Sequence, residues 1–263
     1  MKTVNGFWPG FALFALLAAP CPSYAVSANA LPPDLAALLQ HVEQRGQQES
    51  DNDHAFDQHY SYTRTKSTEL RNSAGQLKST ENKTDSHDPT VVRPKQTIAA
   101  TPRAVQQNNS PVTDTHSNVH GRQFKKSDFL LNEDLINRFD FTMAGNDVVN
   151  GRPAILIDFV PAKKDLPENN LKERFINKAA GRVWIDAEDY SLVKADLHLT
   201  QQVNIGWGLI GSVWKFTYGF ERLRTADGFW YPADVHWHVE GREVIVNRIA
   251  DYHETLGDVK KVK

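Results

Sequence analysis

The chain has 263 residues, with 30 lysines and arginines against 32 aspartates and glutamates, so its formal net charge is -2 at pH 7. This near-neutral balance, without a basic run, argues against nucleic acid as a partner. Hydrophobic residues make up 40% of the chain, which suits one domain of moderate size, or one domain that carries an insert.

The first 25 residues have the organisation of a signal peptide. Lys2 precedes the apolar segment FALFALLAA, which is too short to cross a bilayer. Ser23-Tyr24-Ala25 then supplies the small residues that a signal peptidase recognises, and Ala28-Asn29-Ala30 is a nearly equivalent site. We therefore expect a signal peptide at 1–25 and a secreted mature chain at 26–263, without a transmembrane segment.

Cys21 is the single cysteine and closes the motif LAAPC, which raises the question of a lipid anchor. Pro20 is a poor residue directly before a cysteine that is to be lipidated, so we expect no anchor at this position. Cleavage after Ala25 leaves a mature chain with no cysteine. Disulfides, thiol catalysis and zinc sites that need cysteine are then excluded.

The mature chain is expected to begin with a helix. Leu35, Leu38, Leu39 and Val42 follow two prolines and an aspartate, at the i, i+3, i+4, i+7 spacing of one apolar helix face. We expect this helix to end near Gly46. The polar run QQESDNDHAFDQH comes next.

Strands follow the helix. Residues 59–70 and 77–84 are polar and β-branched and flank a turn around Gly75, which predicts a hairpin. From about 85 to 121 the chain is rich in Thr, Asn, Gln, His, Pro and Ser, with little to bury. We expect a polar, mobile insert there.

The second half of the chain alternates short helices with hairpins. Helical spacing is present over 129–139 and 171–178, and Asn150-Gly151 predicts a tight turn between strands at 140–145 and 153–161. Further strands are expected at 182–186, 192–199, 213–223, 229–239 and 243–253, with turns at 226–228 and at Gly241-Arg242. Such antiparallel neighbours imply one continuous sheet in an α+β fold, mainly antiparallel β.

Asp186, Glu188 and Asp189 lie within four residues, at the tip of one expected hairpin. A catalytic carboxylate pair needs a shared cleft with contrasting environments, and the sequence supplies no sheltered partner. Aspartate is favoured in turns because it bonds to its own backbone. The cluster is therefore interpreted as a solvent-exposed turn.

His236 and His238 flank Trp237, so strand alternation places both imidazoles on the face opposite the indole. A metal would need a third ligand from His198, His253 or Glu240, and the spacing does not select one. Nucleophile-elbow, phosphate-loop and H-E-x-x-H motifs are absent from the sequence. We expect no enzyme, metal or cofactor; a metal-dependent hydrolase is the weakest alternative.

Apolar and aromatic residues outnumber what the short helices can cover. A long twisted sheet under two or three short helices tends to leave a groove that can hold an apolar ligand. The residues expected to line it are Leu35, Leu38, Leu39, Val42, Trp184, Trp207, Leu209, Ile210, Trp214 and Trp237.

In the order of its hairpins and motifs, the chain resembles the LolA-like superfamily of periplasmic outer-membrane lipoprotein-sorting proteins. The segments that carry the resemblance are LPPDLAALLQHVEQR, YTRTKSTELRNSAGQLKSTE, FDFTMAGNDVVNGRPAILIDFVP, GRVWIDAEDYSLVKADLHL and DGFWYPADVHWHVEGR. They cover most of the mature chain outside 85–121. The resemblance implies a periplasmic protein with an unclosed half-barrel sheet, and helices covering its concave face over an apolar cavity for acyl chains.

The resemblance also implies a protein without catalytic residues. The leading hypothesis is a monomeric cell-envelope carrier or binding protein for acyl chains, lipoproteins or another apolar ligand. The alternative is an envelope sensor or regulatory module that binds a membrane-protein partner.

Overall fold

The computed structural model describes residues 35–91, 118–119, 122–123, 133–162, 166–205 and 211–262. The expected signal peptide and most of the polar insert lie outside these ranges. The segment that carries Trp207, Leu209 and Ile210 lies outside them as well.

Ten strands form one antiparallel sheet in the order β2-β1-β12-β11-β10-β8-β7-β6-β5, with β9 paired to β10. The first and last strands of this order are not paired with each other, so the sheet is unclosed, as predicted. The strands are β1 Tyr60–Asn72, β2 Leu77–His87, β5 Phe139–Val149, β6 Arg152–Pro161, β7 Ala179–Asp186, β8 Leu192–Leu199, β9 Val203–Ile205, β10 Gly211–Arg224, β11 Trp230–Glu243 and β12 Val246–Lys261; two short strands, β3 Asn118–Val119 and β4 Arg122–Gln123, pair separately.

Turn chemistry explains most of the hairpins. Asn150 and Gly151 have φ angles of 52° and 77°, which a tight β5–β6 turn requires. The expectation of a turn at Gly241-Arg242 is wrong, because β11 continues to Glu243 and the turn falls at Val244-Ile245. Gly241 instead permits close strand contact: a Cβ there would come 2.6 Å from the Ser212 carbonyl oxygen.

Four helices accompany the sheet in the described part of the chain: α1 Leu35–Gln47, α2 Glu49–His59, α3 Glu133–Ile136 and α4 Leu171–Ile176. Helix α1 was predicted and α2 was not. The buried residues of α2 are Glu49, Asn52 and Phe56, so its buried stripe is mostly polar and a search for apolar spacing misses it. None of these helices is long and apolar enough to cross a membrane.

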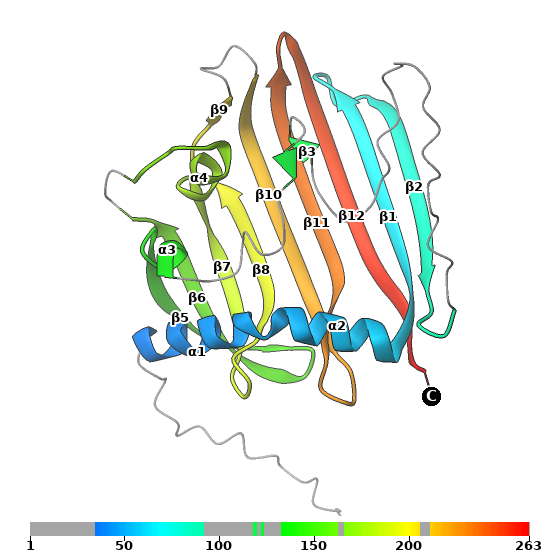
Figure 1. Ribbon diagram of the computed structural model, residues 1–263. Coiled ribbons are helices and arrows are strands. Elements are labelled where there is room, and N and C mark those ends of the chain that lie inside the picture. The colour runs from blue at the N-terminus through cyan, green and yellow to red at the C-terminus, as the bar shows by residue number, and fades with distance from the viewer. Residues whose placement is uncertain are drawn as a thin grey trace, which may run out of the picture. The chain divides into compact units, whose positions relative to one another are not determined.

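Helices α1 and α2 run one after the other across the strands at one end of the sheet (Figure 1). Helix α1 buries its predicted stripe, Leu38, Leu39 and Val42, in a cluster with Ile155 and Ile157 of β6 and Ile185 of β7. We call the face of the sheet that contacts α1 the inner face and the opposite one the outer face. Side chains alternate between the two along every strand.

Candidate functional site

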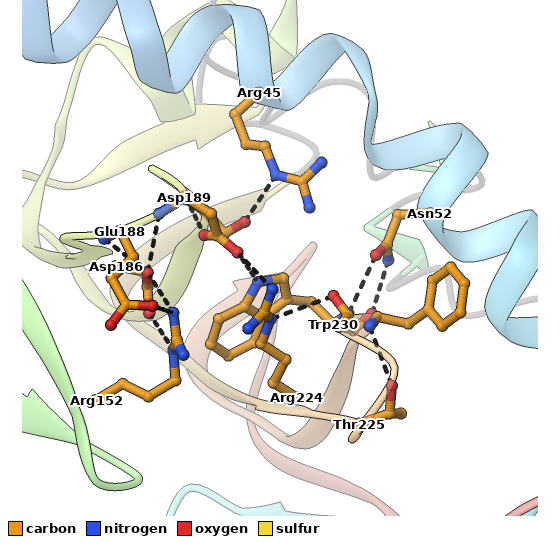
Figure 2. Close-up of polar contacts among 12 residues, drawn as sticks. Arg45, Asn52, Arg152, Asp186, Glu188, Asp189, Arg224, Thr225 and Trp230 are labelled. Carbon is orange, nitrogen blue, oxygen red and sulfur yellow. Dashed lines mark hydrogen bonds and ion pairs between the residues drawn. The ribbon is translucent and has the colours of Figure 1, made fainter.

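The three acidic residues that the sequence gathers lie in the turn between β7 and β8 (Figure 2). Arg152 Nε and Nη2 donate to the two Asp186 carboxylate oxygens at 2.6 and 2.9 Å. The backbone N–H groups of Glu188 and Asp189 donate to Asp186 Oδ1 at 2.9 and 3.0 Å. These four residues form the Asp186 cluster. Because four N–H donors satisfy the Asp186 carboxylate, the role of Asp186 is structural.

The expectation of a solvent-exposed acidic turn is wrong for two of its three residues. Asp186 is only 1% exposed. Asp189 accepts hydrogen bonds from Trp230 Nε1 at 2.9 Å and from the Ser191 N–H at 3.0 Å. Burial raises the pKa of Asp189, but these bonds lower it by more, so the carboxylate is held in its charged form. Only Glu188 extends into solvent.

Polar contacts to this turn and to the neighbouring strands hold the helices against the sheet. Arg45 of α1 donates from Nε to Ser191 Oγ at 2.9 Å. Asn52 of α2 exchanges two hydrogen bonds with the backbone of Trp230, at 2.7 and 3.1 Å (Figure 2). Nearby, Arg222 of β10 makes a buried two-point ion pair with Glu49, at 3.0 and 2.6 Å. Helices α1 and α2 are therefore fixed by polar contacts as well as by apolar packing.

The inner face changes character from one edge of the sheet to the other. Strand pairing places one residue of each strand side by side in a row, about 4.8 Å apart. From β5 to β11 the row is apolar, and from β12 to β2 it is charged. In order, its members are Met143, Ile157, Val183, Ala195, Phe220, Val235, Glu254, Lys66 and Lys83.

An aromatic group occupies the next row of the inner face. Tyr218, Trp237 and Tyr252 are neighbours across β10, β11 and β12, and all three are half-buried. The Trp237 and Tyr252 rings are stacked, with centroids 5.3 Å apart and planes 8° from parallel. Burial raises the pKa of Tyr218 to about 12, helped by the negative charge of Glu254.

A buried charge group, the Glu254 cluster, borders these rings. Glu254 is 3% exposed, and its carboxylate lies 3.3 Å from Arg64 Nε and 3.6 Å from Lys66 Nζ. The Tyr252 hydroxyl donates to the same carboxylate. Burial raises the pKa of Tyr252, and the bond to Glu254 raises it further. Arg64 also lies over the Tyr62 ring, 5.5 Å from its centroid.

The structure brings part of the predicted lining together. Leu38, Leu39 and Val42 lie on the inner face, with Leu35 packed against their cluster. Trp237 is also on the inner face. This group spans two places: the α1 end of the sheet, and the aromatic row of β10–β12.

Two predicted lining residues lie elsewhere. Trp184 follows Val183 and precedes Ile185 in β7, so it points to the outer face, where Lys194 Nζ lies 4.8 Å above its ring. Trp214 is 40% exposed at an irregularity in β10. The remaining three, Trp207, Leu209 and Ile210, lie outside the described residues.

The histidine pair lies on the outer face, opposite Trp237, as strand alternation predicted. His236 Nδ1 and His253 Nε2 contact the two oxygens of Asp234 at 3.0 and 2.5 Å. His238 lies between Asp251 and Glu240, at 2.7 and 3.0 Å. Within the residues that the structure describes, no group of three or more His, Cys, Asp or Glu side chains could hold a metal. These imidazoles are partners of surface carboxylates.

Sequence reasoning missed the Glu254 cluster. A signal is present in each strand, because Arg64 and Lys66, like Tyr252 and Glu254, are spaced two apart and so share a face. What joins the two pairs is the pairing of β1 with β12. Neither segment specifies this partner by itself.

No protein-family model and no curated protein matches the sequence. Among solved structures, an outer membrane lipoprotein-sorting protein domain from Vibrio parahaemolyticus is 12% identical, with 85% of this chain and 93% of that one covered and a TM-score of 0.34. A LolA superfamily protein from Nitrosomonas europaea is 7% identical, with 87% and 93% covered and a TM-score of 0.30. The MucA/MucB complex of Pseudomonas aeruginosa is 9% identical, with 87% and 99% covered and a TM-score of 0.24. The identities are low, so the binding properties of those proteins are not transferred to this chain.

Proposed function

We propose that this protein is a non-catalytic binding protein of the cell envelope that takes up an acyl chain, free or attached to a protein, on its inner face. One observation carries the proposal. The row of the inner face that contains Phe220 is apolar from β5 to β11, yet the aromatic residues on β10–β12, Tyr218 and Trp237 among them, are only partly buried. Helix α1 packs on β6 and β7, with residues of β5 and β8 at the edge of its cluster. Phe56 of α2 packs with Tyr62, Leu256 and Tyr231.

Two parts of this surface would act on a ligand. The stacked Trp237–Tyr252 pair offers a flat apolar wall, and aromatic side chains contribute much of the binding energy at such surfaces. The stripe of Leu35, Leu38, Leu39 and Val42 on α1 would border the end of the acyl chain that lies farthest from these rings. Ligand pockets of this kind are mostly apolar, with a few polar groups that fix orientation.

Native mass spectrometry of protein purified from a periplasm, followed by lipid extraction, tests the proposal directly. We expect a stoichiometric acyl-chain ligand. Protein that is repeatedly recovered empty, and that also fails to take up a fluorescent fatty acid, would contradict the proposal. An affinity pull-down that recovers one inner-membrane protein, whether or not lipid is added, would favour a regulatory module instead.

A matched pair of tryptophan variants locates the surface. Trp237→Ser should weaken binding of the fluorescent fatty acid about tenfold, since about 1.4 kcal/mol of apolar contact is lost. Trp214→Ser removes an indole that is 40% exposed and lies away from the inner aromatic row, so it serves as the control. Equal weakening by the two substitutions would move the site away from the inner face.

A further inference from the structure

The Glu254 cluster holds two cations and one carboxylate. Arg64 and Lys66 both face Glu254, and their side chains are 26% and 19% exposed. Both contacts are longer than the bonds in the Asp186 cluster, at 3.3 and 3.6 Å. One carboxylate neutralises only one of the two positive charges. The remaining charge lies in a partly dehydrated position, where an additional anion would be favoured.

Arg64 also has unused hydrogen-bonding capacity. Its Nε is buried and faces Glu254 Oε1 at 3.3 Å, but the geometry of this ion pair is not that of a hydrogen bond, and no other described residue accepts from the N–H. Its one hydrogen bond runs from Nη2 to the Tyr62 hydroxyl and is 3.4 Å long. Buried polar groups without partners are uncommon in proteins, and each one calls for an explanation. A guanidinium presents its N–H groups as a fork that matches a carboxylate or a phosphate.

Neighbouring charges on β2 do not supply the missing anion. Asp85 is the strand neighbour of Arg64, and Lys83 is the strand neighbour of Lys66. The two β2 side chains pair with each other instead, with Lys83 Nζ 3.0 Å from Asp85 Oδ2. The surplus positive charge therefore stays with Arg64 and Lys66.

The position of this charge in the sheet indicates what would balance it. The row that contains Lys66 and Glu254 continues at once into Val235 and Phe220, and then into apolar residues as far as β5. A free anion would use only the charged end of the row. A molecule with an anionic head and an apolar tail would use both ends.

We propose that Arg64 and Lys66 bind the anionic headgroup, a carboxylate or a phosphate, of an amphiphile whose apolar chain lies along the inner face toward Val235 and Phe220. This inference rests on the proposed function and narrows it to anionic amphiphiles. Glu254 holds the two cations in place and limits their attraction for the ligand.

Three probes with one chain length test the inference: dodecanoate, dodecyl phosphate and dodecanol, each titrated calorimetrically into the mature protein. We expect both anions to bind about tenfold more tightly than dodecanol, the gain typical of a charge-assisted hydrogen bond. Tighter binding of the phosphate than of the carboxylate would support a phospholipid-like head, and the reverse order a fatty acid.

Three variants separate loss of the headgroup site at Arg64 and Lys66 from loss of folding. Lys66→Met should abolish the preference for anions and leave dodecanol binding unchanged. Arg71→Met is the matched control, because Arg71 lies on the outer face of the same strand beside Glu69 and Asp251. Glu254→Gln should tighten binding of both anions, since no carboxylate then competes for the cations. A misfolded variant would not produce such a gain.

The outcomes distinguish failure of the headgroup site from failure of the proposed acyl-chain binding. If wild-type protein binds dodecanol as tightly as the anions, the headgroup site is refuted, while the proposed apolar site is still supported. If none of the three probes binds, the proposed function itself fails. If inorganic phosphate or acetate binds as tightly as dodecyl phosphate, the dodecyl chain contributes nothing to binding and the assignment to amphiphiles is overturned.

Discussion

Asp186 and Glu254 are carboxylates buried in one sheet, at 1% and 3% exposure, and their partners differ. Asp186 accepts four hydrogen bonds of 3.0 Å or less, and one guanidinium matches its charge. Glu254 faces two cations at 3.3 and 3.6 Å, and the buried Arg64 Nε–H in the shorter contact makes no hydrogen bond. A buried carboxylate alone therefore does not mark a binding site. The surroundings of Glu254 differ by a surplus positive charge and a buried N–H without a hydrogen bond, and the proposed headgroup site rests on these two features.

Neutralising Asp186 should give the largest loss of stability. Asp186→Asn removes the charge that faces Arg152, whose other charged partner is the exposed Glu188, and leaves one side-chain oxygen for the four donors that the carboxylate satisfied. Breaking a buried ion pair costs about 3–5 kcal/mol in free energy of unfolding, which urea denaturation would measure. Asp158→Asn is the control, because it breaks the same two-point contact with Arg182 at an exposed site. It should cost about 0–1 kcal/mol. Equal losses would show that burial of Asp186 contributes nothing.

The covered end of the inner face gives the next largest effect. Leu38 of α1 is 0% exposed, so Leu38→Ala should lower the free energy of unfolding by about 3 kcal/mol. Leu70→Ala, at a leucine that is 37% exposed, is the control and should cost much less. If the acyl chain reaches the α1 end, a fluorescent fatty acid should restore part of the loss by filling the space. An identical ligand-induced shift of the thermal midpoint in wild type and Leu38→Ala would confine the ligand to the β10–β12 end.

Glu254→Gln should cost far less than Asp186→Asn, about 1 kcal/mol in free energy of unfolding. Glutamine keeps an acceptor for the Tyr252 hydroxyl, and the partly exposed Arg64 and Lys66 retain contact with water. The urea series that includes Asp186→Asn gives the comparison. Losses of equal size would mean that Glu254 is as fully bonded as Asp186 and that its two cations are structural.

How much of this could be read from the sequence depends on whether the relevant signal is local. The stripe of α1 and the Asn150-Gly151 turn were predicted, because spacing and turn residues specify them within a few positions. Helix α2 was not, since its buried residues include Glu49 and Asn52. The Arg152–Asp186 pair was missed because it joins two hairpins. Alternation along β7 places Trp184 opposite Val183 and Ile185, but only the packing of α1 on Ile185 decides which of the two faces is the inner one.

Removing the Glu188 carboxylate should change stability least. Glu188 shares Arg152 with Asp186, at 2.7 Å from Arg152 Nη2, but its side chain is 61% exposed. Exposed ion pairs contribute little, because water screens the charges and both side chains lose freedom when they pair. Glu188→Ala should therefore change the free energy of unfolding by less than about 0.5 kcal/mol in urea denaturation. Arg152 keeps both bonds to Asp186 in this variant, so the buried part of the cluster is untouched. A loss several times larger would mean that Glu188 and Asp186 hold Arg152 as one unit. The double variant with Asp186→Asn would then show a loss well below the sum of the two single losses.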